Sequence, residues 1–349
     1  MEPSGFVETR NLHKHFGDVR AVDGVDLSIR EGELLVLLGP SGCGKTTLMR
    51  MIAGLETPTS GQILIGGAAV DEDVPPRARG IAMVFQSYAL YPHKTAYDNI
   101  AFPLEAARMS PAAIRGQVQT AANRFGIGLL LGRRPRQLSG GERQRVALSR
   151  AVVRDPKVFL FDEPLSNLDA QLRAIARFEL KQLQRELGTT TLYVTHDQVE
   201  AMGLGDRIAV MNKGKVRQIG TPQSVYDYPA DRFVATFLGS PPMNLLDQGA
   251  DVVLGFRPEN FVPRTDVPPQ VEVAVFRFRV RQVEYLGADR LIYGSVDGEQ
   301  RAEQTLIADL PVTITTPVTE GEVYEFAVPR VALRYFDAQT GMARRDGVA

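Results

Sequence analysis

The chain has 349 residues, which suits two domains of roughly 150 residues each and a large apolar core without disulfide or metal staples. Lysine and arginine (40) nearly balance aspartate and glutamate (41), so the net charge of -1 argues against a broad basic surface for nucleic acid. The single cysteine excludes an intramolecular disulfide, and no apolar run approaches the roughly 20 residues that span a bilayer.

Short apolar runs alternate with helical patterns through the first two thirds of the chain. Residues 34–38 form an uninterrupted apolar run, as expected of a strand buried on both faces of a parallel sheet. Residues 45–53 follow as a helix that Gly54 can end. Two further buried strands are predicted at 158–161 and 191–194. This alternation predicts an α/β fold with a mostly parallel sheet.

A helix with clear ends is predicted between these last two strands. Asp169 can cap its first turn, and Gly188 can stop it. Its apolar stripe consists of Leu172, Ile175, Leu180, Leu183 and Leu187. Residues 95–154 have few β-branched runs and many Ala, Gln, Arg and Leu residues, so they predict a helical insertion into the α/β fold.

The last third of the chain has a different pattern. Residues 207–211 and 215–219 flank an Asn-Lys-Gly turn and predict a hairpin, and Thr221-Pro222 predicts the start of a helix. A linker is predicted at 239–242. Strand patterns follow it at 271–275, 278–283, 323–328 and 331–336, which predicts a small β-barrel or sandwich of about 100 residues.

Residues 39–46 (GPSGCGKT) fit the phosphate-loop pattern. Glycines let backbone N–H groups turn toward a polyphosphate, and the following helix directs its positive end at those anions. Lys45 would bind the β- and γ-phosphates, and the Thr46 hydroxyl would hold Mg²⁺. A glycine-rich turn without function is the alternative, which the preceding strand and following helix disfavour. The expected nucleotide contacts are Gly39, Pro40, Ser41, Gly42, Cys43, Gly44, Lys45, Thr46 and Thr47.

Two further segments carry chemistry once a phosphate loop is present. Asp162 and Glu163 end a predicted strand, where the first can hold Mg²⁺ and the second can polarise an attacking water. Alone, they would be more simply two acidic residues at a turn. Ser139, Gly140 and Gly141 open a predicted helix and form a second anion site, or an ordinary capped helix start. A phosphate loop and a separate glycine-rich helix terminus indicate ATP sandwiched between two chains.

Together these segments resemble the ATP-binding cassette ATPases. The resemblance implies that Gln86 lines the Mg²⁺ and the attacking water and that His196 contacts the γ-phosphate. It also implies that residues 166–169 link two active sites and that Phe16 stacks on adenine. Outside the family these would be a turn residue, a capping histidine, a helix cap and a core aromatic.

Two residues, Glu142 and Phe16, depart from the family pattern, and Cys43 in the phosphate loop needs separate comment. Glu142 stands where the family usually has glutamine, which adds a negative charge near the phosphates and predicts a modest effect on rate. Phe16 is less electron-rich than the usual Trp or Tyr, which predicts weaker adenine stacking. Cys43 lies near a helix N-terminus, which favours thiolate, although a space-filling role is the simpler interpretation.

Longer segments resemble the ATPase subunit of maltose-type sugar importers: residues 86–93, 162–169, 228–233, 239–244 and 256–259. Related subunits serve polyamine, iron and glycerol-phosphate importers.

The importer resemblance also implies a domain organisation. It predicts a P-loop NTPase (RecA-like) core over residues 1–238, with a helical subdomain at about 88–155. An all-β domain of the oligonucleotide/oligosaccharide-binding (OB) type is predicted over 239–349, used in that family for regulation and dimer contact. The short stretch between Asn244 and Phe256 predicts that this domain is trimmed relative to the family.

The resemblance implies a homodimer of ATPase subunits that closes on two ATP and two Mg²⁺ at the cytoplasmic face of the membrane. Its partners would be integral membrane permease subunits, docked near residues 88–93, and indirectly an extracytoplasmic solute-binding protein. The large side chains at 88–91 could instead fill the core of the helical insertion. A soluble cassette protein and a nucleic-acid-binding barrel with Arg277, Arg279 and Arg281 are weaker alternatives, and we expect no nucleic-acid partner.

Overall fold

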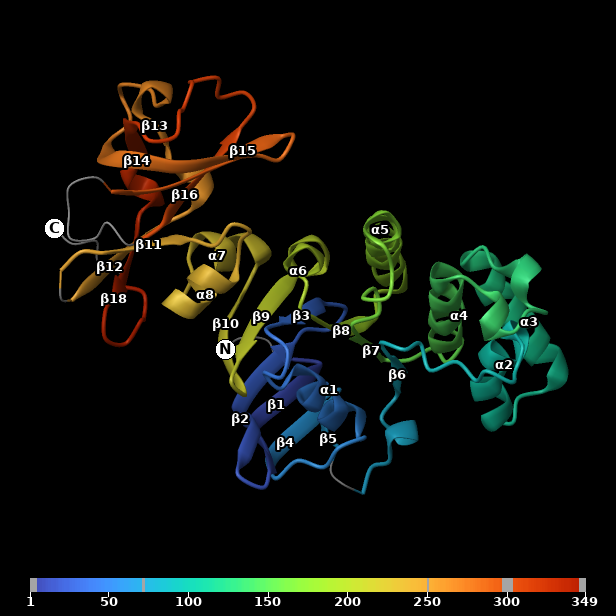
Figure 1. Ribbon diagram of the computed structural model, residues 1–349. Helices are drawn as coiled ribbons and strands as arrows, with labels where there is room; N and C mark the ends of the chain where they lie inside the picture. Colours follow the sequence, from blue (N-terminus) through green and yellow to red (C-terminus); the bar gives the residue numbers. More distant parts are fainter. Residues whose placement is uncertain (1–4, 71–72, 250, 297–303, 345–349) are drawn as a thin grey trace. The chain divides into compact units, whose positions relative to one another are not determined.

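The computed structural model describes residues 5–70, 73–249, 251–296 and 304–344 (Figure 1). The chain forms two compact units, residues 1–222 and residues 223–349. The predicted boundary at residue 239 stays a prediction. Within the described ranges, no helix is both long and apolar enough to cross a membrane.

Two sheets build the first unit. The six-stranded sheet has the order β10-β9-β3-β8-β7-β6, in which β10 is antiparallel and the other five strands are parallel. Its strands are β3 (Leu34–Leu38), β6 (Ile81–Val84), β7 (Val158–Asp162), β8 (Thr190–Thr195), β9 (Arg207–Asn212) and β10 (Lys215–Gly220). An antiparallel sheet of four strands accompanies it, formed by β1 (Val7–Phe16), β2 (Val19–Ile29), β4 (Ser60–Ile65) and β5 (Ala68–Ala69). The parallel sheet and the hairpin of β9 and β10 are confirmed, whereas the antiparallel sheet was not predicted.

Helix α1 (Lys45–Ala53) joins the two sheets. It packs on β2, β7 and β8, and its buried face shares one apolar core with strands of both sheets. Gly54 ends it in the left-handed conformation, as predicted. Helix α6 (Gln198–Leu204) packs on β3 and β8. Because the parallel strands are covered on both faces, all five residues of β3 are buried.

The predicted helical insertion is confirmed. Helices α2 (Ala96–Ala106), α3 (Pro111–Arg124) and α4 (Gly140–Val152) share a small core of their own. Side chains cap all three N-termini: Thr95 and Ser139 form capping boxes, and Ser110 accepts a hydrogen bond from Ala113. The insertion is thus a locally specified helical subdomain.

Helix α5 (Ala170–Leu187) has the predicted ends, because Asp169 caps it and Gly188 terminates it in the left-handed conformation. Its predicted apolar stripe is only half right. Leu180 and Leu183 are buried, but Leu172 and Ile175 are 45% and 49% exposed. The helical period identifies one face of α5, and it does not reveal that only the C-terminal half of that face is covered by the same chain.

The second unit is mainly β-structure. It contains the short helices α7 (Pro222–Asp227, which starts at the division) and α8 (Arg232–Phe237). A three-stranded sheet is formed by β11 (Asn244–Asp247), β12 (Val252–Phe256) and β18 (Arg334–Asp337). A five-stranded sheet is formed by β13 (Val262–Pro263), β14 (Val273–Tyr285), β15 (Asp289–Val296), β16 (Leu306–Pro311) and β17 (Val323–Pro329).

The core of the second unit is aromatic. The rings of Phe256, Phe261, Phe278 and Phe326 form contacts with centroids 5.0–5.2 Å apart. Phe278 is fully buried there, so it cannot stack on a nucleic-acid base. One predicted strand is partly wrong: Val331 lies in a short 3-10 helix (Arg330–Ala332) and is 86% exposed, and β18 begins only at Arg334.

Candidate functional site

The phosphate loop connects β3 to α1, and the backbone of neighbouring strands packs closely against its glycines. A Cβ on Gly39 would lie 2.2 Å from the carbonyl oxygen of Met211, and one on Gly44 would lie 2.1 Å from that of Ala21. Gly44 also has a φ of 107° and leaves the first turn of α1 without a side-chain cap. The N–H groups of that turn are therefore open to an external anion.

Lys45 places its charge inside this loop. The side chain is 4% exposed, and Nζ donates hydrogen bonds to the carbonyl oxygens of Gly39 (2.8 Å) and Pro40 (2.9 Å). Cys43 is also buried, and burial raises the pKa of its thiol. Cys43 belongs to the core of the first unit, which fits the space-filling interpretation, because desolvation outweighs the effect of the nearby lysine on its pKa.

A carboxylate pair meets the loop at the end of β7. Thr46 Oγ1 donates a hydrogen bond to Asp162 Oδ1 at 3.1 Å, which joins residues 116 positions apart in the sequence. Burial, together with the neighbouring charge of Glu163, raises the pKa of Asp162. The pair thus offers oxygen ligands in a place where a nearby cation would relieve electrostatic repulsion.

Glu163 is held in an unusual backbone conformation. Its φ is 45°, a left-handed value that is uncommon for a residue other than glycine. Its N–H donates to the Val194 carbonyl at 3.0 Å, and its own carbonyl accepts from Ser166 Oγ at 2.9 Å. Strain maintained in this way is typical of functional sites.

Two predicted site residues converge on this carboxylate. Gln86 Nε2 donates to Glu163 Oε2 at 3.5 Å, and His196 Nδ1 lies 3.0 Å from the same oxygen. Gln86 follows β6, Glu163 follows β7 and His196 follows β8, so the carboxyl ends of adjacent parallel strands bring them together. The Glu163 side chain is 16% exposed and that of His196 is 52% exposed, which leaves the group open to a substrate.

Two further residues position this cluster: Asn167, in the segment 166–169 that the resemblance already identified, and Glu200, which the sequence did not indicate. Asn167 Nδ2 donates to the Gln86 carbonyl oxygen at 2.7 Å. Glu200, only 2% exposed, accepts from the hydroxyls of Tyr193 and Thr195, both at 2.8 Å, just before His196. Burial raises the pKa of Glu200. An acidic residue on a short helix after a strand gives no sequence signal of such a buried network.

Comparisons with known proteins identify the family of this chain. A model of the ABC transporter family matches residues 22–166, which include the phosphate loop, Gln86 and Glu163. The trehalose/maltose import ATP-binding protein of Thermococcus litoralis is 47% identical over 95% of this chain and 98% of its own length. The chain belongs to the ATP-binding subunits of ABC transporters. This ABC subunit uses ATP.

Further relatives support the same family. The sn-glycerol-3-phosphate import ATP-binding protein of Cereibacter sphaeroides is 46% identical over 96% of this chain and 98% of its own length. A solved ATP-binding cassette, dimeric and bound to ADP and phosphate, shares 33% identity with a TM-score of 0.56 and covers 62% of this chain and 98% of that chain. CbiO1 from Clostridium perfringens shares 30% identity with a TM-score of 0.60 over 65% of this chain and 92% of that chain.

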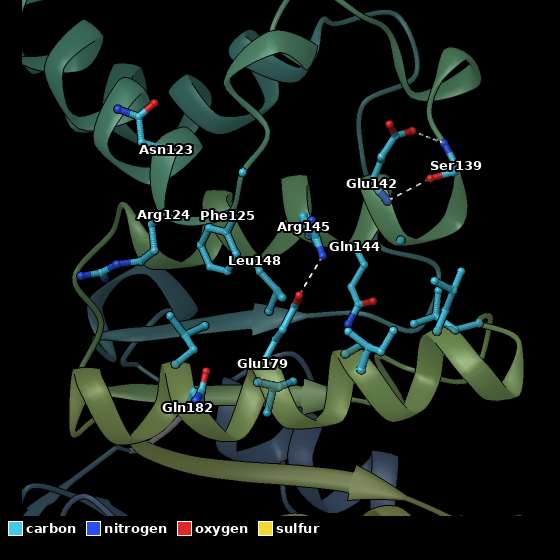
Figure 2. Close-up of a pocket in the computed structure, with 18 of the residues that line it drawn as sticks. Asn123, Arg124, Phe125, Ser139, Glu142, Gln144, Arg145, Leu148, Glu179 and Gln182 are labelled. Carbon is cyan, nitrogen blue, oxygen red and sulfur yellow. Dashed lines mark hydrogen bonds and ion pairs between the residues drawn. The ribbon is translucent and has the colours of Figure 1, made fainter.

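The second predicted anion site of this ABC subunit lies in the helical subdomain. Ser139 Oγ accepts a hydrogen bond from the Glu142 N–H at 3.3 Å, and Glu142 Oε2 accepts from the Ser139 N–H at 2.7 Å (Figure 2). The backbone hydrogen bond from Ser139 lowers the pKa of Glu142. The residue that departs from the family pattern therefore completes the cap of α4.

A groove of about 580 Å³ separates α4 from α5 beside this cap. Figure 2 shows Gln144 of α4 directed toward the side chains of α5 and Glu142 directed away from them, toward Ser139, while Arg145 bonds to Glu179 across the gap at 2.8 Å. The exposed Leu172 and Ile175 line it as well. Helix α4 packs on β6, the edge strand of the parallel sheet, whereas the phosphate loop follows β3 in the middle of the sheet and packs against β9. A Cβ on Gly140 would lie 3.7 Å from the carbonyl oxygen of Asn167, whose side chain bonds to Gln86, so the start of α4 lies beside the segment 166–169.

The remaining predicted contacts are more peripheral. Phe16 ends β1 and is 48% exposed, with Lys14 Nζ 4.8 Å from its ring centroid. In the segment 88–93, Tyr88 is 4% exposed and Leu90 packs against the helical core, whereas Tyr91 is 36% exposed. Part of the predicted docking cluster is therefore core, as the alternative interpretation held. Arg150 fixes the segment by donating to the carbonyl oxygens of Tyr88 (2.8 Å) and Ala89 (2.7 Å).

Proposed function

We propose that two copies of this subunit close on two ATP molecules and that hydrolysis powers the import of a small polar solute, with a sugar as the first candidate. The named relatives import trehalose and maltose or sn-glycerol-3-phosphate, and a related cassette has been solved as a dimer. Polyamine and iron importers are the more distant alternatives. The subunit would act at the cytoplasmic face of the membrane, bound to permease subunits that receive solute from an extracytoplasmic binding protein.

One observation carries this proposal: Thr46, Asp162, Glu163, Gln86 and His196 meet at the mouth of the phosphate loop although four separate segments supply them. A polyphosphate in the loop would have its terminal phosphate next to this cluster. A group that is merely structural would not leave a carboxylate and an imidazole open to solvent beside an uncapped helix.

The donor set fits Mg²⁺. Thr46 supplies a hydroxyl oxygen and Asp162 a carboxylate oxygen only 3.1 Å away, and Gln86 adds an amide. Hard oxygen ligands of this kind are those that Mg²⁺ takes, together with phosphates and water. When bound, Mg²⁺ would neutralise charge on the β- and γ-phosphates.

The chain's own residues would divide the remaining work. Lys45 and the open N–H groups of α1 bind the β- and γ-phosphates, which orients the γ-phosphorus for in-line attack. Glu163 accepts a proton from the attacking water through the oxygen that now faces Gln86 and His196. His196 holds the γ-phosphate and keeps the carboxylate in place. Phe16 stacks on the adenine.

The dimeric state of a related solved cassette supports a shared site. In one chain, α4 packs on the edge strand β6, whereas the phosphate loop follows β3 in the middle of the parallel sheet. A second copy can bring Ser139, Gly140 and Gly141 to that nucleotide, which makes each site composite. Residues 239–349 would then contribute dimer contacts, as the family resemblance implies.

Mixing two inactive variants tests the composite site. Lys45→Ala damages the phosphate loop and Ser139→Arg blocks the second anion site, so each variant alone should hydrolyse ATP poorly. After mixing, half of the dimers would be hybrids with one intact site each, which predicts recovery to about a quarter of wild-type turnover. The ATPase activity of the wild type should also rise faster than linearly with protein concentration.

Each variant is first checked for native circular dichroism and for solubility. A Ser139→Ala variant keeps the site unobstructed and should retain more activity than Ser139→Arg. If mixing restores nothing and specific activity is independent of concentration, the site is self-contained and the dimeric mechanism is wrong.

A further inference from the structure

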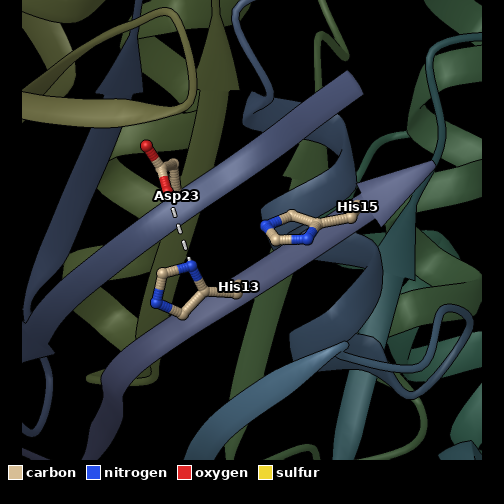
Figure 3. A group of neighbouring side chains, drawn as sticks. All are labelled: His13, His15 and Asp23. Atoms are coloured by element: carbon tan, nitrogen blue, oxygen red, sulfur yellow. Dashed lines mark ion pairs between the residues drawn. The ribbon is translucent and has the colours of Figure 1, made fainter. Parts of the chain in front are cut away.

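Two histidines and an aspartate gather on the antiparallel sheet, outside the residues assigned to ATP. His13 and His15 lie two positions apart on β1, and Asp23 lies on β2 as the register partner of His13. One nitrogen or oxygen from each side chain lies within 4.8 Å of the other two. Figure 3 shows the three groups drawn together from neighbouring strands, with the His15 ring directed toward the other two.

The distances suit ligands of one ion. His13 Nδ1 lies 3.5 Å from Asp23 Oδ1. Two ligands that each lie about 2.0–2.1 Å from a tetrahedral zinc ion are separated by about 3.4 Å. The two groups therefore need little adjustment to share a metal.

The bonding around His13 favours the tautomer that binds metal through Nδ1. Nδ1 accepts a hydrogen bond from the Gly24 N–H at 3.1 Å, so it carries no proton. Nε2 lies 3.1 Å from Asn11 Oδ1, to which it can donate. The bond from Nε2 to an oxygen fixes the ring as it does in ligating histidines, and a metal would take the Nδ1 lone pair that now accepts from Gly24.

His15 supplies an independent observation. Its Nε2 is enclosed by the protein and has no hydrogen-bond partner. A buried polar atom without a partner is uncommon and requires an explanation. A third ligand to an ion held by His13 and Asp23 would provide one.

The two basic side chains that contact Asp23 can move away when a metal ion binds. Lys215 Nζ lies 3.2 Å from Asp23 Oδ2 and Arg20 Nη1 lies 3.8 Å from Asp23 Oδ1, but both basic side chains are more than half exposed. Exposed ion pairs of this kind contribute little free energy. A hollow of about 420 Å³ lined by His13, Asp23 and Lys215 gives an ion access. The Gly24 hydrogen bond is the contact that the metal would have to replace.

We propose that His13, His15 and Asp23 form a binding site for a divalent transition-metal ion, with zinc as the expected occupant and water completing the coordination. Two imidazoles and a carboxylate suit zinc and disfavour Mg²⁺ and Ca²⁺, which take oxygen ligands. The ion would join β1 to β2 immediately before Phe16 and would restrain the strand end that carries the predicted adenine contact.

Metal titration of the full chain without a histidine tag tests this site. Calorimetry with ZnCl₂ in excess Mg²⁺ should show one zinc per chain, and zinc should raise the melting temperature because it binds the folded state. His15→Gln and Asp23→Asn should each weaken zinc binding by more than about tenfold, since even outer partners of a metal site are worth that much. X-ray absorption of the zinc-loaded wild type should show two imidazole nitrogens at about 2.0–2.1 Å.

Matched variants distinguish this site from the other histidines. His93→Gln and His196→Gln remove the remaining two histidines and should leave the first zinc in place. The proposal fails if zinc does not bind, or if it binds unchanged in both His15→Gln and Asp23→Asn. It also fails if binding is lost in His196→Gln, because zinc then occupies the Glu163–His196 pair. The X-ray absorption of the wild type decides the question even where a variant does not fold.

Discussion

The two glycine-rich helix starts of this ABC subunit look alike in sequence and differ in structure. At α1, Gly44 provides no side-chain cap, Lys45 follows at once, and the first turn contains no acidic residue. At α4, Ser139 caps the helix and Glu142 returns a carboxylate to the Ser139 N–H. The first terminus is open to an external anion, and the second is already satisfied by an internal one.

The difference shows that anion binding at a helix N-terminus depends on which side chains of the protein already interact with its N–H groups. A phosphate arriving at α4 must tolerate the negative charge of Glu142, which lies at the third helical position. A phosphate arriving at α1 meets a lysine and, across Thr46, a carboxylate pair that can share Mg²⁺. We therefore expect α1 to dominate binding and chemistry and α4 to respond to smaller changes in charge.

The largest effect is expected from Glu163→Gln. Glu163 is the proposed proton acceptor for the attacking water, whereas the carboxylate at the start of α4, Glu142, caps a helix. The change keeps the shape and removes the proton acceptor, so turnover should fall by about 10²–10⁴-fold. ATP should still bind and hold the dimer together, because reopening requires hydrolysis. Steady-state ATPase assays and size-exclusion chromatography with ATP measure both effects.

Glu105→Gln, an exposed glutamate on α2, is the matched control and should have wild-type activity. If Glu163→Gln retains turnover within about tenfold of wild type, equal to a barrier change below ~1.4 kcal/mol, then another group activates the water.

Asp162→Asn should separate stability from activity. The raised pKa of Asp162 means that the folded state binds a proton at this carboxyl more tightly than the unfolded state does. The stabilisation that this proton provides is lost as the pH rises through the folded pKa. The amide should therefore raise the melting temperature at neutral pH, by an amount that shrinks in acid. Mg²⁺-dependent turnover should fall by more than about a hundredfold, because loss of a charged metal ligand costs several kcal/mol.

Differential scanning calorimetry across pH and ATPase assays at varied Mg²⁺ measure these two effects. Asp155→Asn makes the same chemical change at an exposed turn and should alter neither. A melting temperature that falls in Asp162→Asn would show that the hydrogen bond from Thr46 outweighs the desolvation of the charge.

The smallest effect is expected from Glu142→Gln at the start of α4. The amide oxygen can still accept from the Ser139 N–H, so the cap is retained, and the like charge near the phosphates is removed. We expect the KM for ATP to fall by less than about tenfold, and the gain should diminish at high salt because charges are screened.

Glu186→Gln removes a charge from the opposite wall of the same groove and serves as the control. An equal change in both variants would indicate a general field across the groove. An increase in KM specific to Glu142→Gln would show that the capping carboxylate is needed in its ionised form, and the contrast between the two helix starts would be weaker than proposed.

Local sequence patterns predicted most of the helices and strands that surround the phosphate loop. The strand at Leu34–Leu38, the helix at Lys45–Ala53 and the caps Asp169 and Gly188 were all identified correctly. These elements depend on apolar runs, glycines and capping residues that act within a few positions of themselves. The antiparallel sheet of β1, β2 and β4 was missed because register shifts at Leu12, His13 and His15 interrupt its alternation.

The sequence predicted which residues form the candidate site, but it did not predict how they are arranged. Pattern and family resemblance identified Gln86, Glu163 and His196, but neither indicated that all three meet at one carboxylate oxygen. Exposure was also misjudged where only tertiary packing decides it. Tyr88, predicted to lie on a docking surface, is buried. Leu172, predicted to pack in the apolar stripe of α5, is exposed.

The sequence by itself determined the elements whose causes are local: the phosphate loop, the helix ends and the buried strands of the parallel sheet. Tertiary structure alone decided which charges face one another. Asp162 acquires its raised pKa from burial and from Glu163, the Glu200 network forms across β8 and α6, and His13, His15 and Asp23 meet only because β1 pairs with β2. The physical reason is that burial and Coulomb interaction depend on distances in space, and strand pairing and packing set those distances between residues remote in the chain.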